Sequence, residues 1–138
     1  MDRERSLEVL RKRSTGELFI QAFWEKPMGG ATFQGHPLGL PPDVSDETLG
    51  EAILSALRAY STVFDPSQAV RFTEGEYQRL LREHDVVSVE RWPSGETIIV
   101  RMQRSSGGLE GTRRRRALQP GASIDDIVAA IRIALGDA

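Results

Sequence analysis

LPPDVSDETLGEAILSAL, from Leu40 to Leu57, is the stretch that decides this fold, because much of it returns as LQPGASIDDIVAAIRIAL from Leu118 to Leu135. Without a gap, the two windows share residues at Leu40/Leu118, Pro42/Pro120, Ser45/Ser123, Ala52/Ala130, Ile53/Ile131, Ala56/Ala134 and Leu57/Leu135. Two unrelated windows of this length would share about one residue at average residue frequencies. The second window therefore repeats one structural unit, unless two independent amphipathic helices use the same common start residues.

Each copy predicts a helix that begins at a serine. Ser45 and Ser123 can each accept a hydrogen bond from an N–H of the first helical turn, and acidic residues follow directly. Behind them, apolar residues recur at the three- and four-residue spacing of one helix face. Alanines alternate with large aliphatic residues on this face, so each helix can lie close against a flat partner. We therefore predict two similar helices, over residues 45–60 and 123–136, packed on a β-sheet.

Four or five further segments predict strands. Glu17–Trp24 is dense in aromatic and aliphatic residues over strand length, which favours a central, mostly buried strand. Val86–Trp92 and Thr97–Gln103 flank a Pro-Ser-Gly turn and form the clearest hairpin. Residues 112–118 can pair as the next antiparallel strand, and residues 31–34 can add a short strand within a loop rich in glycine and proline.

Thr73 and Glu76 have the spacing of a capping box, in which each side chain satisfies the backbone N–H of the other residue, so a middle helix is expected to run to about His84. Residues 1–14 carry a short apolar pattern that predicts a loosely attached N-terminal helix. Successive strands joined by tight turns favour antiparallel pairing. We therefore predict one α+β domain over residues 1–138, with a mostly antiparallel sheet of four to five strands and about three helices.

Length and composition restrict the function. A chain of 138 residues can bury one core but is short for two domains, and a formal charge of -2 argues against a globally basic nucleic-acid binder. The chain has no cysteine, and therefore no disulfide or cysteine metal site, which suits the cytoplasm. No apolar run approaches the roughly 18 residues that span a bilayer, and the first residues lack the apolar core of a signal peptide. We expect a cytoplasmic protein that does not enter a membrane.

Candidate catalytic groups are few. The only histidines, His36 in a loop and His84 at a helix end, lie far apart and match no metal-ligand spacing. Adjacent acids at the helix starts are explained by helix stability. The glycines of residues 29–35 fit neither a dinucleotide-binding loop nor a phosphate-binding loop. We therefore expect no enzyme activity, no catalytic residue, no metal, no cofactor and no small-molecule substrate.

Acidic residues gather around the first copy and form an acidic strip of Asp43, Asp46, Glu47 and Glu51. Stabilisation of the helix start explains Asp46 and Glu47. Asp43 precedes the cap, however, and Glu51 lies off the apolar face. The strip is therefore either a helix start with incidental neighbours or an exposed surface for a basic partner, which it would steer and select.

Basic residues gather at the opposite end of the sequence, where we define a basic set of Arg101, Arg104, Arg114 and Arg116. Successive side chains of a strand point to opposite faces, so at most two members of the run Arg113–Arg116 share one surface. The run is open to three interpretations: a solvated edge strand that resists aggregation, a protein contact, or a nucleic-acid contact. No aromatic residue is interleaved for base stacking.

The first window resembles the signature segment of the contact-dependent growth inhibition (CDI) immunity protein family of bacteria, in which a leucine-proline, an acidic cap and Leu-Gly-Glu-Ala open a helix. PGASIDDIVAAIRIAL resembles the second, weaker version of that helix in the same family. Together with the aromatic-rich first strand and the central hairpin, the likeness covers most of residues 16–136. The sequence departs from the family pattern at Ile124 and Val128, where the usual acid and glycine are missing.

This resemblance implies a cytoplasmic antidote that binds the C-terminal toxin domain of a CDI effector delivered by a neighbouring cell and occludes its active site. Such toxins are commonly nucleases with basic substrate clefts, so the acidic strip is the expected toxin contact. The alternative function is a small nucleic-acid-binding regulator that uses the basic set on the Arg113–Arg116 strand.

Overall fold

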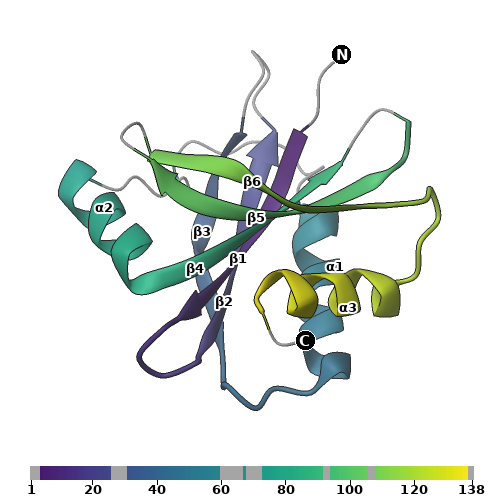
Figure 1. The fold of residues 1–138 in the computed structure, drawn as a ribbon, viewed down its shortest axis with the longest axis horizontal. Coiled ribbons are helices and arrows are strands. Elements are labelled where there is room, and N and C mark those ends of the chain that lie inside the picture. The colour runs from purple at the N-terminus through teal and green to yellow at the C-terminus, as the bar shows by residue number, and fades with distance from the viewer. Residues whose placement is uncertain are drawn as a thin grey trace.

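The computed structural model describes residues 4–25, 31–59, 67, 73–91, 94–105 and 108–136, which form one sheet and three helices (Figure 1). The strands are β1 (Glu4–Lys12), β2 (Leu18–Glu25), β3 (Ala31–Leu40), β4 (His84–Arg91), β5 (Thr97–Ser105) and β6 (Gly108–Leu118), and the helices are α1 (Asp46–Ala59), α2 (Glu74–Glu83) and α3 (Ile124–Ala134). The strands lie in the order β3-β2-β1-β4-β5-β6, and each neighbouring pair is antiparallel. The predicted α+β class is confirmed, with six strands where four to five were expected.

The additional strand lies at the N-terminus. The prediction of a loosely attached helix within residues 1–14 is wrong, because β1 lies in the centre of the sheet between β2 and β4. Leu7 and Val9 are fully buried there, and Leu7 pairs with Ala22 on one side and with Val89 on the other. Pairing along both edges satisfies the backbone N–H and C=O groups of the segment. Tertiary pairing therefore outweighs the local preference of this short apolar stretch.

α1 and α3, the two repeated segments, pack on the sheet as predicted, and both lie on the same face of it. Figure 1 shows the two helices together and α2 at the far end of the sheet. Ile53 and Ile131 occupy equivalent places in the two copies, and both are fully buried in the core that the helices share with Leu7, Val89 and Ile99. We call this side of the sheet the helix-pair face.

The predicted helix starts are present. The backbone N–H of Thr48 donates to Ser45 Oγ at 3.1 Å, and that of Asp126 donates to Ser123 Oγ at 3.2 Å. α2 begins with the complete capping box, in which Thr73 and its third helical residue exchange side-chain and backbone hydrogen bonds. The three starts therefore follow from side chains that satisfy N–H groups left unpaired in the first turn.

A glycine sets the distance between α1 and α3. A Cβ atom added to Gly50 would lie 3.3 Å from Ile124 Cγ1 and 3.6 Å from Val128 Cγ2. Val128 is the residue of the second copy that corresponds to Gly50 in the first. The glycine of one copy thus receives the valine of the other, and the departures from the repeat at Ile124 and Val128 fill the space that Gly50 leaves.

α2 covers the other side of the sheet, which we call the α2 face. Leu81 of α2 packs there with Leu10, Val86 and Met102, next to Ile98 and Val100. This second core is smaller than the core of the helix-pair face. The chain therefore buries both faces of its central strands, which explains why β4 is buried without a break from Val86 to Glu90.

The equivalence of the two copies can be tested at their central isoleucines. We expect Ile53→Ala and Ile131→Ala each to lower the free energy of unfolding by about 2–5 kcal/mol, because each leaves a cavity in the same core. Ile133 lies on the exposed side of α3, so Ile133→Ala is expected to lower the free energy of unfolding by less than about 1 kcal/mol. Urea denaturation of the three variants measures these values. A loss at only one of the two buried positions would contradict an equivalent role for the two helices.

Candidate functional site

The carboxylate of Asp85 is the centre of an arginine network on the helix-pair face. Asp85 is the second residue of β4 and lies directly opposite Arg11 of β1. Its Oδ2 accepts from Arg11 Nη2 at 3.3 Å, and its Oδ1 lies 2.9 Å from both Arg13 Nε and Arg101 Nη2. The Asp85 side chain is only 14% exposed. One largely buried carboxylate therefore gathers three cations from the ends of β1 and from β5.

This network changes the titration of its members. Burial alone would raise the pKa of Asp85, but the hydrogen bond from Arg13, the charge of Arg101 and the hydrogen bond from Arg11 outweigh it, so this pKa lies below its ordinary value. Burial lowers the pKa of Arg101, Asp85 raises it, and the neighbouring charge of Arg114 lowers it further. A guanidinium nevertheless stays protonated at neutral pH, and the site carries more positive than negative charge.

Two of these arginines, together with Arg114 of β6, reach the end of α3. Arg11 donates to the carbonyl oxygen of Leu135, Arg101 Nη1 donates to that of Ala134 at 3.0 Å, and Arg114 Nη2 lies 3.5 Å from that of Ile133. The last carbonyls of a helix have no partner within the helix and carry its negative dipole end, so cations are favourable there. The network therefore fixes α3 against β1, β5 and β6.

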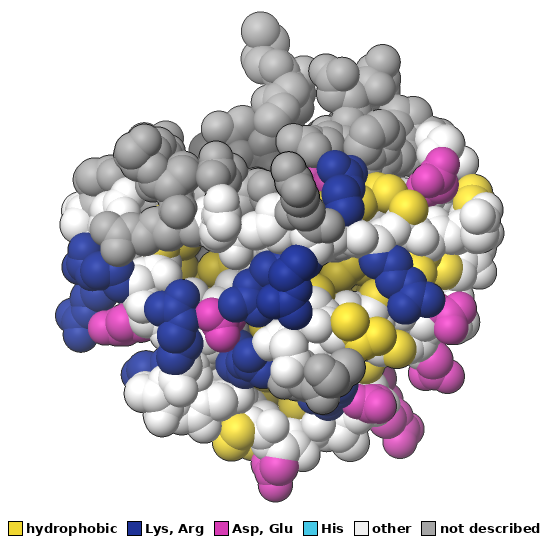
Figure 2. Space-filling view, in the orientation of Figure 1, with side chains coloured by type: hydrophobic (Ala, Val, Ile, Leu, Met, Phe, Trp, Pro, Cys, Tyr) yellow, Lys and Arg dark blue, Asp and Glu magenta, His cyan; other side chains and the backbone are white. Residues whose placement is uncertain are grey.

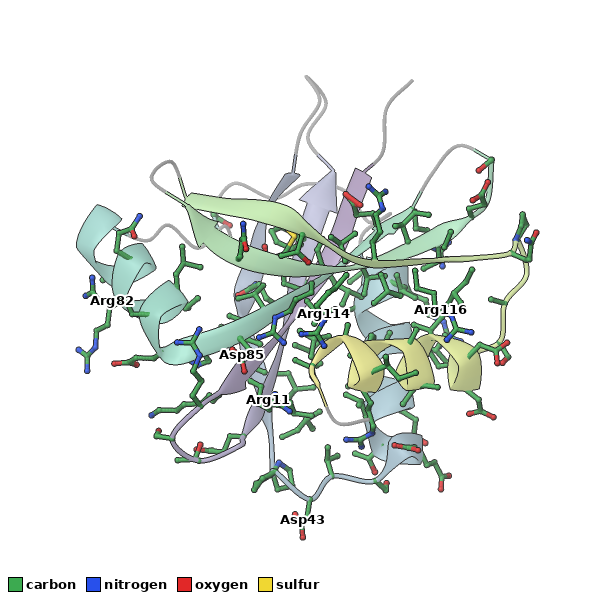
Figure 3. The ribbon with its side chains drawn as sticks, viewed as in Figure 1. Arg11, Asp43, Arg82, Asp85, Arg114 and Arg116 are labelled. Atoms are coloured by element: carbon green, nitrogen blue, oxygen red, sulfur yellow. The ribbon has the colours of Figure 1, made fainter. Side chains whose placement is uncertain are left out.

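The basic set is divided between structural and exposed positions. Arg101 is 19% exposed and bonds Asp85 and Ala134, so its guanidinium belongs to the internal network. Arg104 lies in β5, and its side chain falls outside the described residues. Arg114 and Arg116 are exposed on β6, where Figure 3 shows both beside α3. Figure 2 shows basic side chains in a band across this side, with apolar side chains visible between them.

The acidic strip is also divided. Asp43 lies exposed in the turn before α1, and Glu47 and Glu51 are exposed one turn apart on that helix. Asp46 accepts a 2.5 Å hydrogen bond from Arg132 Nε of α3, whose Nη2 also donates to the carbonyl oxygen of Val44. Asp46 thus links the two helices, while the other three carboxylates of the strip face solvent.

Of the two histidines, only the side chain of His84 lies within the described residues. His84 Nδ1 lies 2.9 Å from the carbonyl oxygen of Leu80, and its ring packs edge-on against Phe19. Since a carbonyl only accepts, the ring nitrogen donates, and His84 completes the end of α2. The side chain of His36 falls outside the described residues. Among the side chains that the structure describes, no three His, Asp or Glu residues are arranged to hold a metal ion.

Sequence reasoning missed the Asp85 network. Its members lie as far apart in the chain as Arg11 and Asp85, and they meet only because β1 and β4 are neighbours. The one local signal is that Arg11 follows Leu7 and Val9 on the same face, where a further apolar residue would be expected. A charge in that place indicates a partner across the sheet, but the sequence does not identify it.

The stabilising role of Asp85 depends on pH. Its folded-state pKa is lowered below the unfolded value of about 3.9, so its stabilisation is complete above about pH 4 and is lost as the pH falls through the folded-state pKa. We expect Asp85→Asn to lower the free energy of unfolding by about 2 kcal/mol at neutral pH. Urea titrations of both proteins should show this difference shrinking in acid. Glu83→Gln, which removes a surface ion pair with Arg79, serves as the control and should have a much smaller effect.

No protein-family model and no curated protein matches this chain. Two solved structures share its fold over nearly the whole length. A protein of unknown function, NMB0488 from Neisseria meningitidis, is 17% identical with a TM-score of 0.64, covering 100% of this chain and 98% of its own. A chain of the CdiA-CT/CdiI toxin and immunity complex from Yersinia pseudotuberculosis is 15% identical with a TM-score of 0.63, covering 98% of each chain. No helix among the described residues is long and apolar enough to cross a membrane.

Proposed function

We propose that this chain is an immunity protein that binds and neutralises the toxin domain of a CDI effector in the cytoplasm. The observation that carries the proposal is the fold, which matches a chain of a toxin and immunity complex over 98% of both chains. The resemblance of Leu40–Leu57 to the immunity-family signature supports the same function from the sequence. The fold likeness depends on the whole architecture, whereas the signature concerns one helix.

Neutralisation of this kind requires binding without turnover. One immunity protein covers the active site of one toxin molecule, so affinity and specificity replace catalysis. A nuclease toxin would present a basic cleft, because its substrate is a polyanion. The exposed carboxylates of Asp43, Glu47 and Glu51 offer the complementary charge on the α1 side of the helix-pair face. Charge complementarity of this type accelerates association and excludes wrong partners.

Asp46 would act differently from the rest of the acidic strip. Its ion pair with Arg132 holds α1 against α3 and partly neutralises the charge of the Asp46 carboxylate. In a complex it would hold the start of α1 in place, while Asp43, Glu47 and Glu51 contact the toxin. We therefore assign direct contact to these three residues and a positioning role to Asp46.

Charge reversal tests whether the acidic strip contributes more to toxin binding than acidic residues elsewhere on the surface. We expect Asp43→Lys combined with Glu51→Lys to weaken binding to the toxin domain about tenfold or more, because attraction becomes repulsion at the contact. The control variant, Glu83→Lys with Glu96→Lys, changes the net charge equally at α2 and at the hairpin turn and should alter affinity less than about threefold. Surface plasmon resonance at two salt concentrations measures both. Equal losses in the two variants would remove the acidic strip as the contact.

The function itself is tested by the neighbouring gene. We expect the gene to follow one that encodes a very large secreted adhesin with a variable C-terminus. That C-terminal domain should arrest growth when expressed alone in a bacterial host, and coexpression of this chain should restore growth and yield a copurifying complex. A toxic domain that neither binds this chain nor is counteracted by it would contradict the proposal.

A further inference from the structure

A groove runs between β6 and α3 on the helix-pair face. Two hollows form it, with volumes of about 270 and 420 Å³. A third hollow of about 310 Å³, lined by residues of α2, β4, β5 and β6 but by none of α3, adjoins them at Arg114. The two hollows beside α3 share Arg116 in their walls. The hollows therefore follow one another from the Asp85 network, along the side of α3, to the turn that precedes this helix.

The first hollow beside α3 has an apolar floor and a cationic rim. Ile99 of β5 with Ala130 and Ala134 of α3 forms the floor, and Arg114 and Arg116 stand on the rim. The rim arginines are exposed, and Figure 3 shows them in succession along β6. The adjoining hollow adds Arg13 and Arg101 of the Asp85 network, together with the Asp85 carboxylate. In the groove, an apolar surface and positively charged side chains therefore lie side by side.

Ile133 is an exposed apolar residue without a structural reason for its type. It lines the groove and is 47% exposed, one of only two large hydrophobic residues so exposed among the described positions. The corresponding residue of the first copy is Ser55, which is exposed on α1. A helix of this pattern therefore tolerates a small polar residue at this place. The isoleucine adds apolar surface to the groove and little to the core.

The dimensions suit an extended peptide segment. The strand from Arg114 to Leu118 is about 13 Å long at the rise of a β-strand, and the helix from Asp126 to Ala134 is about 12 Å long at the rise of an α-helix. About four extended residues would fit beside α3, and more with the hollow at the Asp85 network. Alternate side chains of an extended segment point in opposite directions, so aliphatic residues can reach the floor while acids reach the rim.

We propose that this groove binds an extended segment of a partner protein in which acidic and aliphatic residues alternate. Arg114 and Arg116 would pair with the carboxylates, and Ile133 with the floor would bury the aliphatic side chains. The described lining of the two hollows beside α3 contains no aromatic side chain for base stacking, which argues against a single-stranded nucleic acid. The inference does not rest on the proposed toxin neutralisation, since the groove and the acidic strip are different surfaces.

Fluorescence anisotropy with a labelled peptide of about eight alternating glutamate and leucine residues tests the proposal on the full chain. We expect binding that weakens as salt is added. Arg114→Gln combined with Arg116→Gln should raise the dissociation constant about fivefold or more, and Ile133→Ser about threefold. Serine and isoleucine have similar helix propensity, so the second variant should keep its stability. Arg82→Gln, on exposed α2 outside the groove, removes one charge and should leave binding unchanged.

Other ligands test whether something other than an acidic and aliphatic peptide occupies the groove. A peptide in which lysine replaces glutamate should not bind, and one in which serine replaces leucine should bind more weakly. The proposal would be falsified if all variants bound the glutamate-leucine peptide equally, or if no binding occurred. Tighter binding of an oligothymidylate that is insensitive to Ile133→Ser would assign the surface to nucleic acid instead. Self-association that the double arginine variant abolishes, measured by analytical ultracentrifugation, would assign it to a second copy of this chain.

Discussion

The position of α3 is the constraint on which the rest of this structure depends, and ionic hydrogen bonds fix it. Apolar packing on a flat sheet is not directional, so a helix with an alanine-rich face could slide along the strands. Arg11 and Arg101 donate to the last carbonyl oxygens of α3, and Asp85 holds both guanidinium groups in place. At its last turn, Arg132 of α3 reaches Asp46 of α1. The helix is thus located along its axis as well as against the sheet.

The differences between the two copies are therefore as informative as their identities. The shared apolar residues of the two helices, such as Ile53 and Ile131, lie in the common core. Several residues that differ lie where the helices meet each other. Gly50 accommodates the neighbouring Val128, and Asp46 meets Arg132, whose counterpart in the first copy is apolar. Two identical helices could not make these contacts. The repetition describes two similar elements whose differences make them complementary, and it gives no evidence on ancestry.

Sequence patterns predicted the parts of the fold that local interactions determine. The serine caps, the capping box at Thr73, the two helices and the hairpin all follow from side chains within a few residues of each other. β1 was missed because its burial comes from two neighbouring strands, one of which is distant in the chain. The partners of Asp85 were missed for the same reason. Local hydrogen bonds and periodicity are visible in a sequence, whereas the pairing order of a sheet is not.

The charged residues show this limit most clearly. The sequence grouped Arg101, Arg114 and Arg116 as one basic surface, yet Arg101 is bound to Asp85 and α3, while the other two remain exposed. It grouped Asp46 with its acidic neighbours, yet Asp46 is bound to Arg132. In each set, one member is bound in the contacts that hold α3, while other members are exposed to solvent. A charge cluster in a sequence therefore has to be separated into structural and available charges before it is assigned to a partner.

The acidic strip and the groove both depend on the packing of α1 against α3. The groove has α3 as one wall, and the acidic strip lies on α1, which Asp46 and Gly50 hold against α3. A change that displaces α3, such as the loss of Asp85, would alter both surfaces together and could not separate their roles. Exposed residues that make no contact between the helices, Glu51 on one surface and Arg116 on the other, change one surface at a time. The two binding roles are therefore separable only through residues that do not hold the helix pair.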